Sequence, residues 1–324
     1  MQVLASHSYI SNFKKMKKFV IYCIIFSMPL FLLLIFLETT TRNIPNSYSY
    51  KYNYIKTHGY DIQAISIGHS QLHDGFAPAH FYIPAFNLSN SAQNYIDDYY
   101  LLKEVIQFLP NLKIVILPIG YMNVGAQNED YSLSERSCYY HKYMNVNYEG
   151  LLPLKYALEC FDPYKASEKI YMYYFEGTDM IGCDSLGRRN HYLKDRKIDG
   201  PKKIQEEFNL GEHDAKNMII QYEYYLLAII EMLQKKGIHI LLVSPPYYWE
   251  RFYSINKQQQ NFAINFAKGI QHKYQIYYCN LECDTAFQDR DFYDDSHLNE
   301  YGAVKFTNKL NAALQLEDFT AKQP

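Results

Sequence analysis

The sequence lacks the excess of positive charge that proteins binding nucleic acid usually have. Its 32 lysines and arginines stand against 34 aspartates and glutamates. Because a basic patch is what neutralises phosphates, we expect no nucleic acid among the partners. Tryptophan is also scarce, with one residue against 34 tyrosines. A tyrosine-rich surface suits carbohydrate contact, since the ring stacks and the hydroxyl hydrogen-bonds, but the biased composition of an AT-rich genome accounts for the same count.

Cysteine pairs at metal-ligand spacing are missing as well. The six cysteines include no Cys-x-x-Cys motif, so we expect neither a metal nor another cofactor. Cys23 lies in an apolar segment, which leaves an odd number, five, for the rest of the chain. A Cys138–Cys160 disulfide and buried free thiols are both open.

An apolar run at residues 19–37 is long enough to cross a bilayer core as a helix. Four lysines precede the run, whereas Glu38 and a single arginine follow it. Cytoplasmic flanks are rich in lysine and arginine, so we expect residues 1–18 in the cytoplasm and a single-pass anchor in the inner membrane. Everything after Glu38 is then periplasmic or extracellular. No small-x-small cleavage site follows the run, which favours a retained anchor over a signal peptide; Met16 is an alternative start to Met1.

Short apolar runs alternate with helical periodicity in the rest of the chain. The runs and the periodic segments predict strands at 62–67, 85–88, 113–119, 238–243 and 276–281, and helices at 96–109, 214–236, 256–272 and 300–313. This alternation predicts a three-layer α/β domain, with a mostly parallel sheet between helices on both faces. We place the domain at 61–324, after a stem at 38–60. Residues 121–211 lack clean periodicity, and we expect them to form an insertion of short helices and loops.

A serine stands at the end of the first predicted strand. Ser70 follows that strand after Gly68 and His69. Glycine permits a sharp turn there, because it adopts backbone angles that other residues avoid. The carboxyl ends of parallel strands are where open α/β sheets bind their ligands. The sequence therefore offers Ser70 as a nucleophile; its other common role is to cap the helix that follows.

A histidine and an aspartate near the end of the chain complete the chemistry. A serine hydroxyl is a weak nucleophile until a base removes its proton, and His297 would be that base. Asp294, three residues upstream, would hold the imidazole and offset its positive charge. Asp295 competes for the carboxylate role, and an ordinary surface histidine is the plain interpretation of His297.

The order of these motifs resembles the SGNH/GDSL hydrolase superfamily. The likeness rests on Gly68-His69-Ser70 near the start of the domain and Asp294-x-x-His297 near its end. It is strongest for membrane-anchored envelope members, which include the D-alanyl-transfer protein DltD and alginate O-acetylation proteins. The resemblance implies a flavodoxin-like three-layer fold and a catalytic set of Ser70, His297 and Asp294.

The same resemblance implies an oxyanion hole of three donors. These are the backbone N–H of Ser70, the backbone N–H of Ala92 and the side chain of Asn123. Ala92 stands where the family usually has glycine, and a left-handed backbone there would be strained. The block around Asn123 has one residue more than the Gly-x-Asn pattern of the family.

Other polar and aromatic residues allow two interpretations each. Arg188 and Arg189 would bind an acidic sugar or occupy a solvated turn. Tyr247 and Trp249, which follow a strand at the functional edge, would line a glycan groove or pack into the core. A cluster of polar residues, His69, His73, Asp74 and His80, follows the first predicted strand. No second group of metal-ligand residues accompanies it in the sequence, so we expect no metal there.

These expectations combine into one function with two alternatives. The leading one is an extracytoplasmic serine esterase or acyltransferase that acts on O-acyl groups, most simply O-acetyl, of an envelope or exported polysaccharide. Its partners would be that glycan and, by the resemblance, a multi-pass membrane acyltransferase. The alternatives are a non-catalytic carbohydrate-binding or assembly protein on a degenerate fold, and a lipid-directed esterase or thioesterase.

Overall fold

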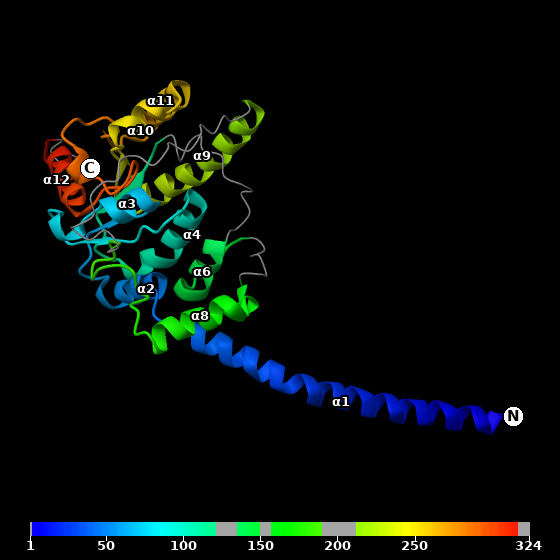
Figure 1. Cartoon of the computed structure of the whole chain (residues 1–324). Coiled ribbons are helices and arrows are strands. Elements are labelled where there is room, and N and C mark those ends of the chain that lie inside the picture. Colours follow the sequence, from blue (N-terminus) through cyan, green and yellow to red (C-terminus); the bar gives the residue numbers. More distant parts are fainter. Residues whose placement is uncertain (1, 121–134, 150–156, 190–211, 317–324) are drawn as a thin grey trace. The chain divides into compact units, whose positions relative to one another are not determined.

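The computed structural model describes residues 2–120, 135–149, 157–189 and 212–316 (Figure 1). The chain divides into two compact units. The first unit consists of Met1–Pro45 and Pro153–Met180, and the second consists of Asn46–Leu152 and Ile181–Pro324. The second unit contains the whole sheet and, as shown below, every described residue of the candidate site.

Helix α1 (Gln2–Arg42) dominates the first unit. Within the described residues it holds one segment, Lys15–Arg42, that is long and apolar enough to cross a membrane, with a mean hydropathy of 2.8 and 6% of its most apolar window buried. The expected span at 19–37 lies inside this segment. Helix α8 (Pro163–Tyr174) and the 3-10 helix η3 (Glu159–Phe161) belong to the same unit, where the Cys160 amide donates to the Glu38 carboxylate at 2.9 Å.

The second unit is built on a five-stranded, fully parallel sheet. Its strands are β1 (Ala64–Ser66), β2 (Ala85–Asn87), β3 (Ile114–Pro118), β4 (His239–Ser244) and β5 (Tyr277–Asn280). The strand order is β2-β1-β3-β4-β5, a common order for doubly wound sheets. Strand β2 lies on one side of β1 and strand β3 lies on its other side, so the direction in which the chain adds strands reverses after β2. Open α/β sheets bind ligands at such a reversal, outside the carboxyl ends of the strands.

Helices cover both faces of the sheet, as the alternation along the sequence predicts. The helices that define the two faces are α2 (Ser47–His58), α3 (Ser70–Gly75), α4 (Tyr95–Val105), α9 (Glu212–Gln234), α11 (Lys257–Tyr274) and α12 (Glu300–Leu316). Alternate strand residues point to opposite faces. Ile65 and Val115 belong to a core with α2, α4, α9 and α11, whereas Ala64 and Ile116 belong to a second core with α3 and α12.

The structure differs from the stem that we expected at residues 38–60. Residues Ser47–His58 form helix α2, which Asn46 caps through its side chain, and Ile55 is fully buried in the core. The sequence pattern missed this helix because tyrosines make up most of its packed face. Tyr48 and Tyr52 lie against the core although they read as polar in a hydrophobic pattern.

The other differences between the structure and the predictions concern the ends of helices and strands and the predicted insertion at 121–211. The first strand is shorter than predicted, and the helix predicted at 96–109 is α4 followed by the 3-10 helix η2 (Ile106–Phe108). Within 121–211 the described residues form helix α6 (Glu135–Met144), η3 and α8. The rest of that insertion lies outside the described residues. The structure assigns no disulfide to the six cysteines, all of which lie among the described residues.

Candidate active site

The turn after β1 places Ser70 at the first position of helix α3. Gly68 has a φ of +133°, and a Cβ on it would collide with the ring of Pro118 at the end of β3. Only glycine tolerates both conditions. His69, not Ser70, is the N-cap residue, because its Nδ1 accepts from the Gln71 amide at 3.4 Å. The Ser70 side chain is therefore not used to cap the helix.

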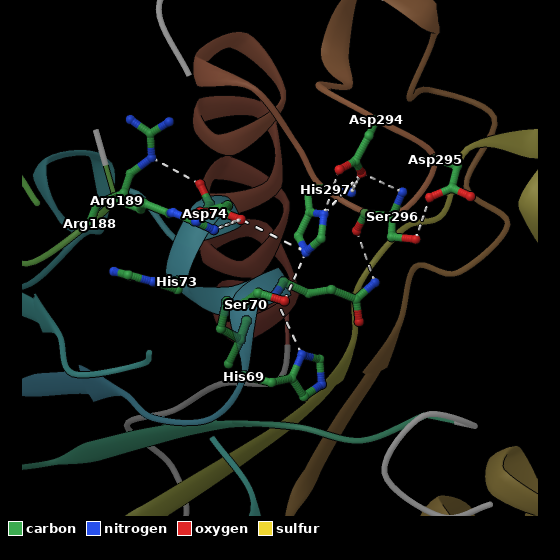
Figure 2. A network of polar contacts seen from close by, with 12 residues as sticks. His69, Ser70, His73, Asp74, Arg188, Arg189, Asp294, Asp295, Ser296 and His297 are labelled. Carbon is green, nitrogen blue, oxygen red and sulfur yellow. Dashed lines mark hydrogen bonds and ion pairs between the residues drawn. The ribbon is translucent and has the colours of Figure 1, made fainter. Parts of the chain in front are cut away.

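Ser70, His297 and Asp294 form one continuous set of hydrogen bonds (Figure 2). His297 Nε2 lies 2.8 Å from Ser70 Oγ, and His297 Nδ1 lies 2.9 Å from each carboxylate oxygen of Asp294. The two halves come from positions 227 residues apart in the chain. This is the arrangement that activates a serine: a base on the hydroxyl and a carboxylate on the far nitrogen of the base.

The loop before α12 holds the carboxylate in place. Asp294 Oδ1 accepts from the amides of Ser296 and His297, at 2.9 and 2.8 Å. These bonds close a short turn that carries both the carboxylate and the imidazole. Asp295 instead accepts from the Ser296 hydroxyl at 2.7 Å, so it does not compete for His297.

The pair titrates as its geometry requires. Burial disfavours the charged imidazolium, but the hydrogen bond and negative charge of Asp294 outweigh burial and raise the pKa of His297 above its ordinary value. For Asp294, burial alone would raise the pKa, but the bonds from His297 and from the two loop amides lower it. The carboxylate therefore stays ionised while the imidazole gains and loses its proton.

Two backbone amides are candidate donors to an oxyanion. Within the part of the chain that the structure describes, the amides of Ser70 and Ala92 donate to no backbone carbonyl. The loop that carries Ala92 is tied to the turn of the nucleophile, since the Asn90 amide donates to the Gly68 carbonyl at 3.0 Å. Ala92 has a φ of +53°, the left-handed conformation that favours glycine. Asn123, the third expected donor, lies outside the described residues.

The two aromatic residues expected to bind substrate have different environments. Tyr247 is buried, and its hydroxyl donates to the Gln71 side chain at 3.4 Å; that side chain in turn donates to the Ser296 carbonyl at 3.1 Å. Tyr247 thus supports the loop that carries Asp294 and His297. Trp249, at the start of helix α10 (Trp249–Ser254), is 56% exposed and open to a ligand. Between them, Tyr248 packs edge-on against Phe292 in the core.

The polar residues near the nucleophile do not gather as a metal site. No group of three or more His, Cys, Asp or Glu side chains with the geometry to hold a metal occurs among the described residues. His69 caps α3, and Asp74 lies instead beside His297 and Arg189.

Asp74 and Arg189 are neighbours of the site that sequence reasoning did not connect to it. Asp74 is fully buried, and its Oδ2 lies 3.9 Å from His297 Nε2 and 3.6 Å from Arg189 Nη1. Asp74 stands four residues after Ser70, one helical turn away, and this spacing was the available signal. No pattern in the sequence places Arg189 there.

The sequence reasoning also missed Glu282, whose side chain lies at the edge of the sheet where the strands have their carboxyl ends. Glu282, just after β5, is 1% exposed, and burial raises its pKa to about 7. The Gln260 side chain donates to its Oε2 at 3.3 Å. A Cβ built on Gly120, just after β3, would stand 3.3 Å from Glu282 Oε1 and 4.0 Å from the Tyr247 hydroxyl. Glu282 therefore lies near Tyr247, which supports the loop that carries Asp294 and His297.

No model of a known protein family matches the sequence, and no curated protein matches it. The geometry of the site is therefore the basis on which a function can be assigned.

Proposed function

We propose that this protein is an SGNH-type serine esterase or O-acyltransferase. The observation that carries the proposal is the chain of hydrogen bonds from Ser70 through His297 to Asp294, at 2.8 and 2.9 Å. The site lies at the reversal of strand order, where α/β sheets bind ligands. The order β2-β1-β3-β4-β5 is also that of flavodoxin-like folds, to which the SGNH type belongs, and it supports the assignment.

The reaction follows from the positions of these groups. Ser70 Oγ attacks the carbonyl carbon of an ester while its proton passes to His297 Nε2, and Asp294 offsets the charge on the imidazolium. The amides of Ser70 and Ala92 would donate to the oxyanion of the tetrahedral intermediate. As the intermediate collapses, His297 returns the proton to the departing alcohol oxygen, which leaves an acyl group on Ser70.

The second half of the reaction reverses these roles. Water or a sugar hydroxyl loses its proton to His297 and attacks the acyl carbon. The second tetrahedral intermediate then collapses with return of the proton to Ser70 Oγ. Attack by water completes an esterase cycle, and attack by a sugar hydroxyl completes an acyl transfer.

The proposed substrate is an O-acyl group, most simply O-acetyl, on an envelope or exported polysaccharide. The lysine-flanked segment Lys15–Arg42 supports an anchor in the cytoplasmic membrane with the catalytic unit outside the cytoplasm. Exposed aromatic side chains such as Trp249 suit stacking on sugars. A multi-pass membrane acyltransferase that delivers the acyl group is the partner we propose on the family resemblance.

A lipid-directed esterase is the second candidate, and the membrane-spanning segment favours it. An enzyme tethered to a bilayer meets lipid esters at high local concentration. Comparison of acetylated polysaccharide with long-chain acyl lipids separates the two. A preference for long acyl chains would overturn the O-acetyl assignment.

The proposal is tested with the full-length protein in detergent. Wild type is expected to hydrolyse p-nitrophenyl acetate and to react with a fluorophosphonate probe at Ser70. Ser70→Ala should abolish labelling and lower the rate by about 10³-fold or more. Ser185→Ala, at an exposed turn, is the matched control and should behave as wild type. Equal hydrolysis by wild type and Ser70→Ala would overturn the enzyme assignment.

A further inference from the structure

We propose that Asp74 is a second carboxylate that acts on the catalytic imidazole, with Arg189 as the counter-charge that limits its effect. This inference rests on the proposed function of Ser70 and His297. It assigns Asp74 and Arg189 as positioning residues that set the proton affinity of the base without touching substrate.

The first step is the placement of Asp74. It stands on α3 one helical turn after Ser70, and its side chain is fully buried. Its Oδ2 lies 3.9 Å from His297 Nε2, whereas Asp294 binds the opposite nitrogen, Nδ1 (Figure 2). The imidazole therefore lies between two carboxylates, one on each ring nitrogen.

The second step is the way in which Arg189 reaches Asp74. Arg189 Nη1 lies 3.6 Å from Asp74 Oδ2, and its amide donates to the His73 carbonyl of α3 at 3.1 Å. Arg188 donates through Nε to the main-chain oxygen of Asp74 at 2.9 Å. Two consecutive arginines from the insertion thus dock on the helix that begins with the nucleophile.

The turn that presents the arginines is itself fixed. Cys183 and Arg189 form an isolated antiparallel bridge, and the Leu186 carbonyl accepts from the Asn87 amide at the edge of β2 at 2.9 Å. Gly187 has a φ of +84°, and a Cβ on it would collide with the Asn87 carbonyl. A turn held this closely fixes the backbone from which the Arg189 side chain reaches Asp74.

The third step is the chemical consequence. During acylation the proton of Ser70 moves to His297 Nε2, the nitrogen that faces Asp74. A carboxylate at 3.9 Å stabilises the imidazolium formed there. If that stabilisation were too strong, His297 would keep its proton and could not act as a base at neutral pH. The positive charge of Arg189 opposes this stabilisation of the imidazolium.

Among the described residues, the charged groups that shift the pKa of His297 are Asp294 from its own loop, Asp74 from α3 and Arg189 from the docked turn. His69 and His73 lie on the segment that carries Ser70 (Figure 2). Asp294 and Asp74 both raise the pKa of His297, and Arg189 lowers it, in that order of size. The effects of Asp74 and Arg189 are therefore opposite in sign, which gives the test its direction.

The test is the pH dependence of kcat/KM for p-nitrophenyl acetate, measured with the full-length protein in detergent. Its acidic limb reports the pKa of His297 in the free enzyme. Asp74→Asn keeps the size of the side chain and removes its charge, so the limb should move down by about one pH unit. Arg189→Gln should move it up by a smaller amount. Asp295→Asn, a neighbouring carboxylate bonded to Ser296, is the control and should leave the limb in place.

Two results would overturn the proposal. An unshifted acidic limb in Asp74→Asn would remove the role of Asp74. A downward shift in Arg189→Gln would remove the limiting role of Arg189, because it would show that Arg189 serves to keep Asp74 ionised. An effect on folding alone would lower the rate at every pH without moving the limb.

An NMR titration of ¹³C-labelled histidine separates this inference from the proposed function. The His297 resonance is assigned from its loss in His297→Gln, and its pKa is followed in wild type, Asp74→Asn and Arg189→Gln. The expected shifts have the same signs as those of the acidic limb and need no enzymatic activity. A shift in the titration together with unchanged hydrolysis in Ser70→Ala would retain the electrostatic pair and reject the enzyme.

Discussion

The ammonium group of Lys51 donates to the main-chain oxygen of Ser89. Lys51 is fully buried on α2, and Ser89 belongs to the loop that carries Ala92. Lys51 also lies 3.4 Å from the side-chain oxygen of Asn90, whose amide binds the Gly68 carbonyl. A helix from the segment expected to be a stem therefore supports the proposed oxyanion side of the site.

Replacement of Lys51 should change how stability depends on pH. Burial lowers the pKa of Lys51 from 10.5 to about 8. Between these values the unfolded chain binds more protons than the folded chain, so stability rises as pH rises. Lys51→Met removes this dependence. The stability of wild type relative to Lys51→Met should therefore increase by about 3 kcal/mol from pH 8 to 10.5, measured by urea unfolding.

The control for this experiment is Lys268→Met, at an exposed position of α11. Its unfolding curve should run parallel to that of wild type over the same pH range. Parallel curves for Lys51→Met and wild type would contradict the burial of a charged amine at this position.

Glycine at position 92 should stabilise the protein and keep it active. Ala92 has a φ of +53°, a conformation that costs a residue with a Cβ about 1–2 kcal/mol. Glycine removes that strain but adds entropy to the unfolded chain, so Ala92→Gly should gain up to about 1 kcal/mol. The backbone amide is retained, and ester hydrolysis should stay within about twofold of wild type.

Ala312→Gly provides the comparison for Ala92→Gly. Ala312 is exposed within α12, where glycine should destabilise the helix by about 1 kcal/mol. Opposite signs of the two melting-temperature changes are expected. A loss of stability in both variants would show that the left-handed backbone at Ala92 is not strained.

Removal of the charge on Asp294 should disable the base. In Asp294→Asn the amide oxygen can still accept from the loop amides, but the side chain no longer offsets the charge on His297. The imidazole then favours the wrong tautomer, and kcat should fall by about 10⁴-fold. Steady-state hydrolysis measures this, with Asp295→Asn as the matched control. A fall of less than tenfold would mean that His297 takes its orientation from another group.

Glu282 gives a second dependence of stability on pH, opposite in direction to that of Lys51. Its folded-state pKa is about 7 against an ordinary value of 4.5. Between these values the folded chain binds more protons than the unfolded chain, so its stability falls as pH rises. Glu282→Gln should therefore gain about 3 kcal/mol relative to wild type from pH 4.5 to 7.

The exposed residue Glu231 on α9 is the control for Glu282. Glu231→Gln should follow the wild-type unfolding curve at every pH. If Glu282→Gln follows it as well, the carboxyl of Glu282 is hydrated in solution and not buried.

Local patterns predicted most of the sheet and its helices. Continuous apolar runs such as 113–119 became buried parallel strands, because a strand covered on both faces has no polar side. The same rules did not predict helix α2. Most of its packed face consists of tyrosines, and only their neighbours in the fold show which part of each ring is buried.

The candidate site likewise has parts that the sequence predicts and parts that only the structure reveals. Ser70 after Gly68, and Asp294 with His297, are short motifs whose chemistry can be read from the residue types. Ala92, at the position where the family that the chain resembles usually has glycine, has a left-handed backbone. The exclusion of Asp295 needed coordinates, because its distance from His297 in sequence does not reveal which carboxylate the loop turns toward the ring.

What the sequence determined alone is therefore the inventory of reactive groups, the alternation of strands and helices, and an apolar segment long enough to cross a membrane. Tertiary structure decided which groups meet. Ser70 follows β1 and His297 follows β5, and they come within 2.8 Å of each other because parallel strands end at one edge of the sheet. Asp74 joins them, and Arg189 reaches Asp74, only through packing. Charges act through distance in space, which the chain order does not encode.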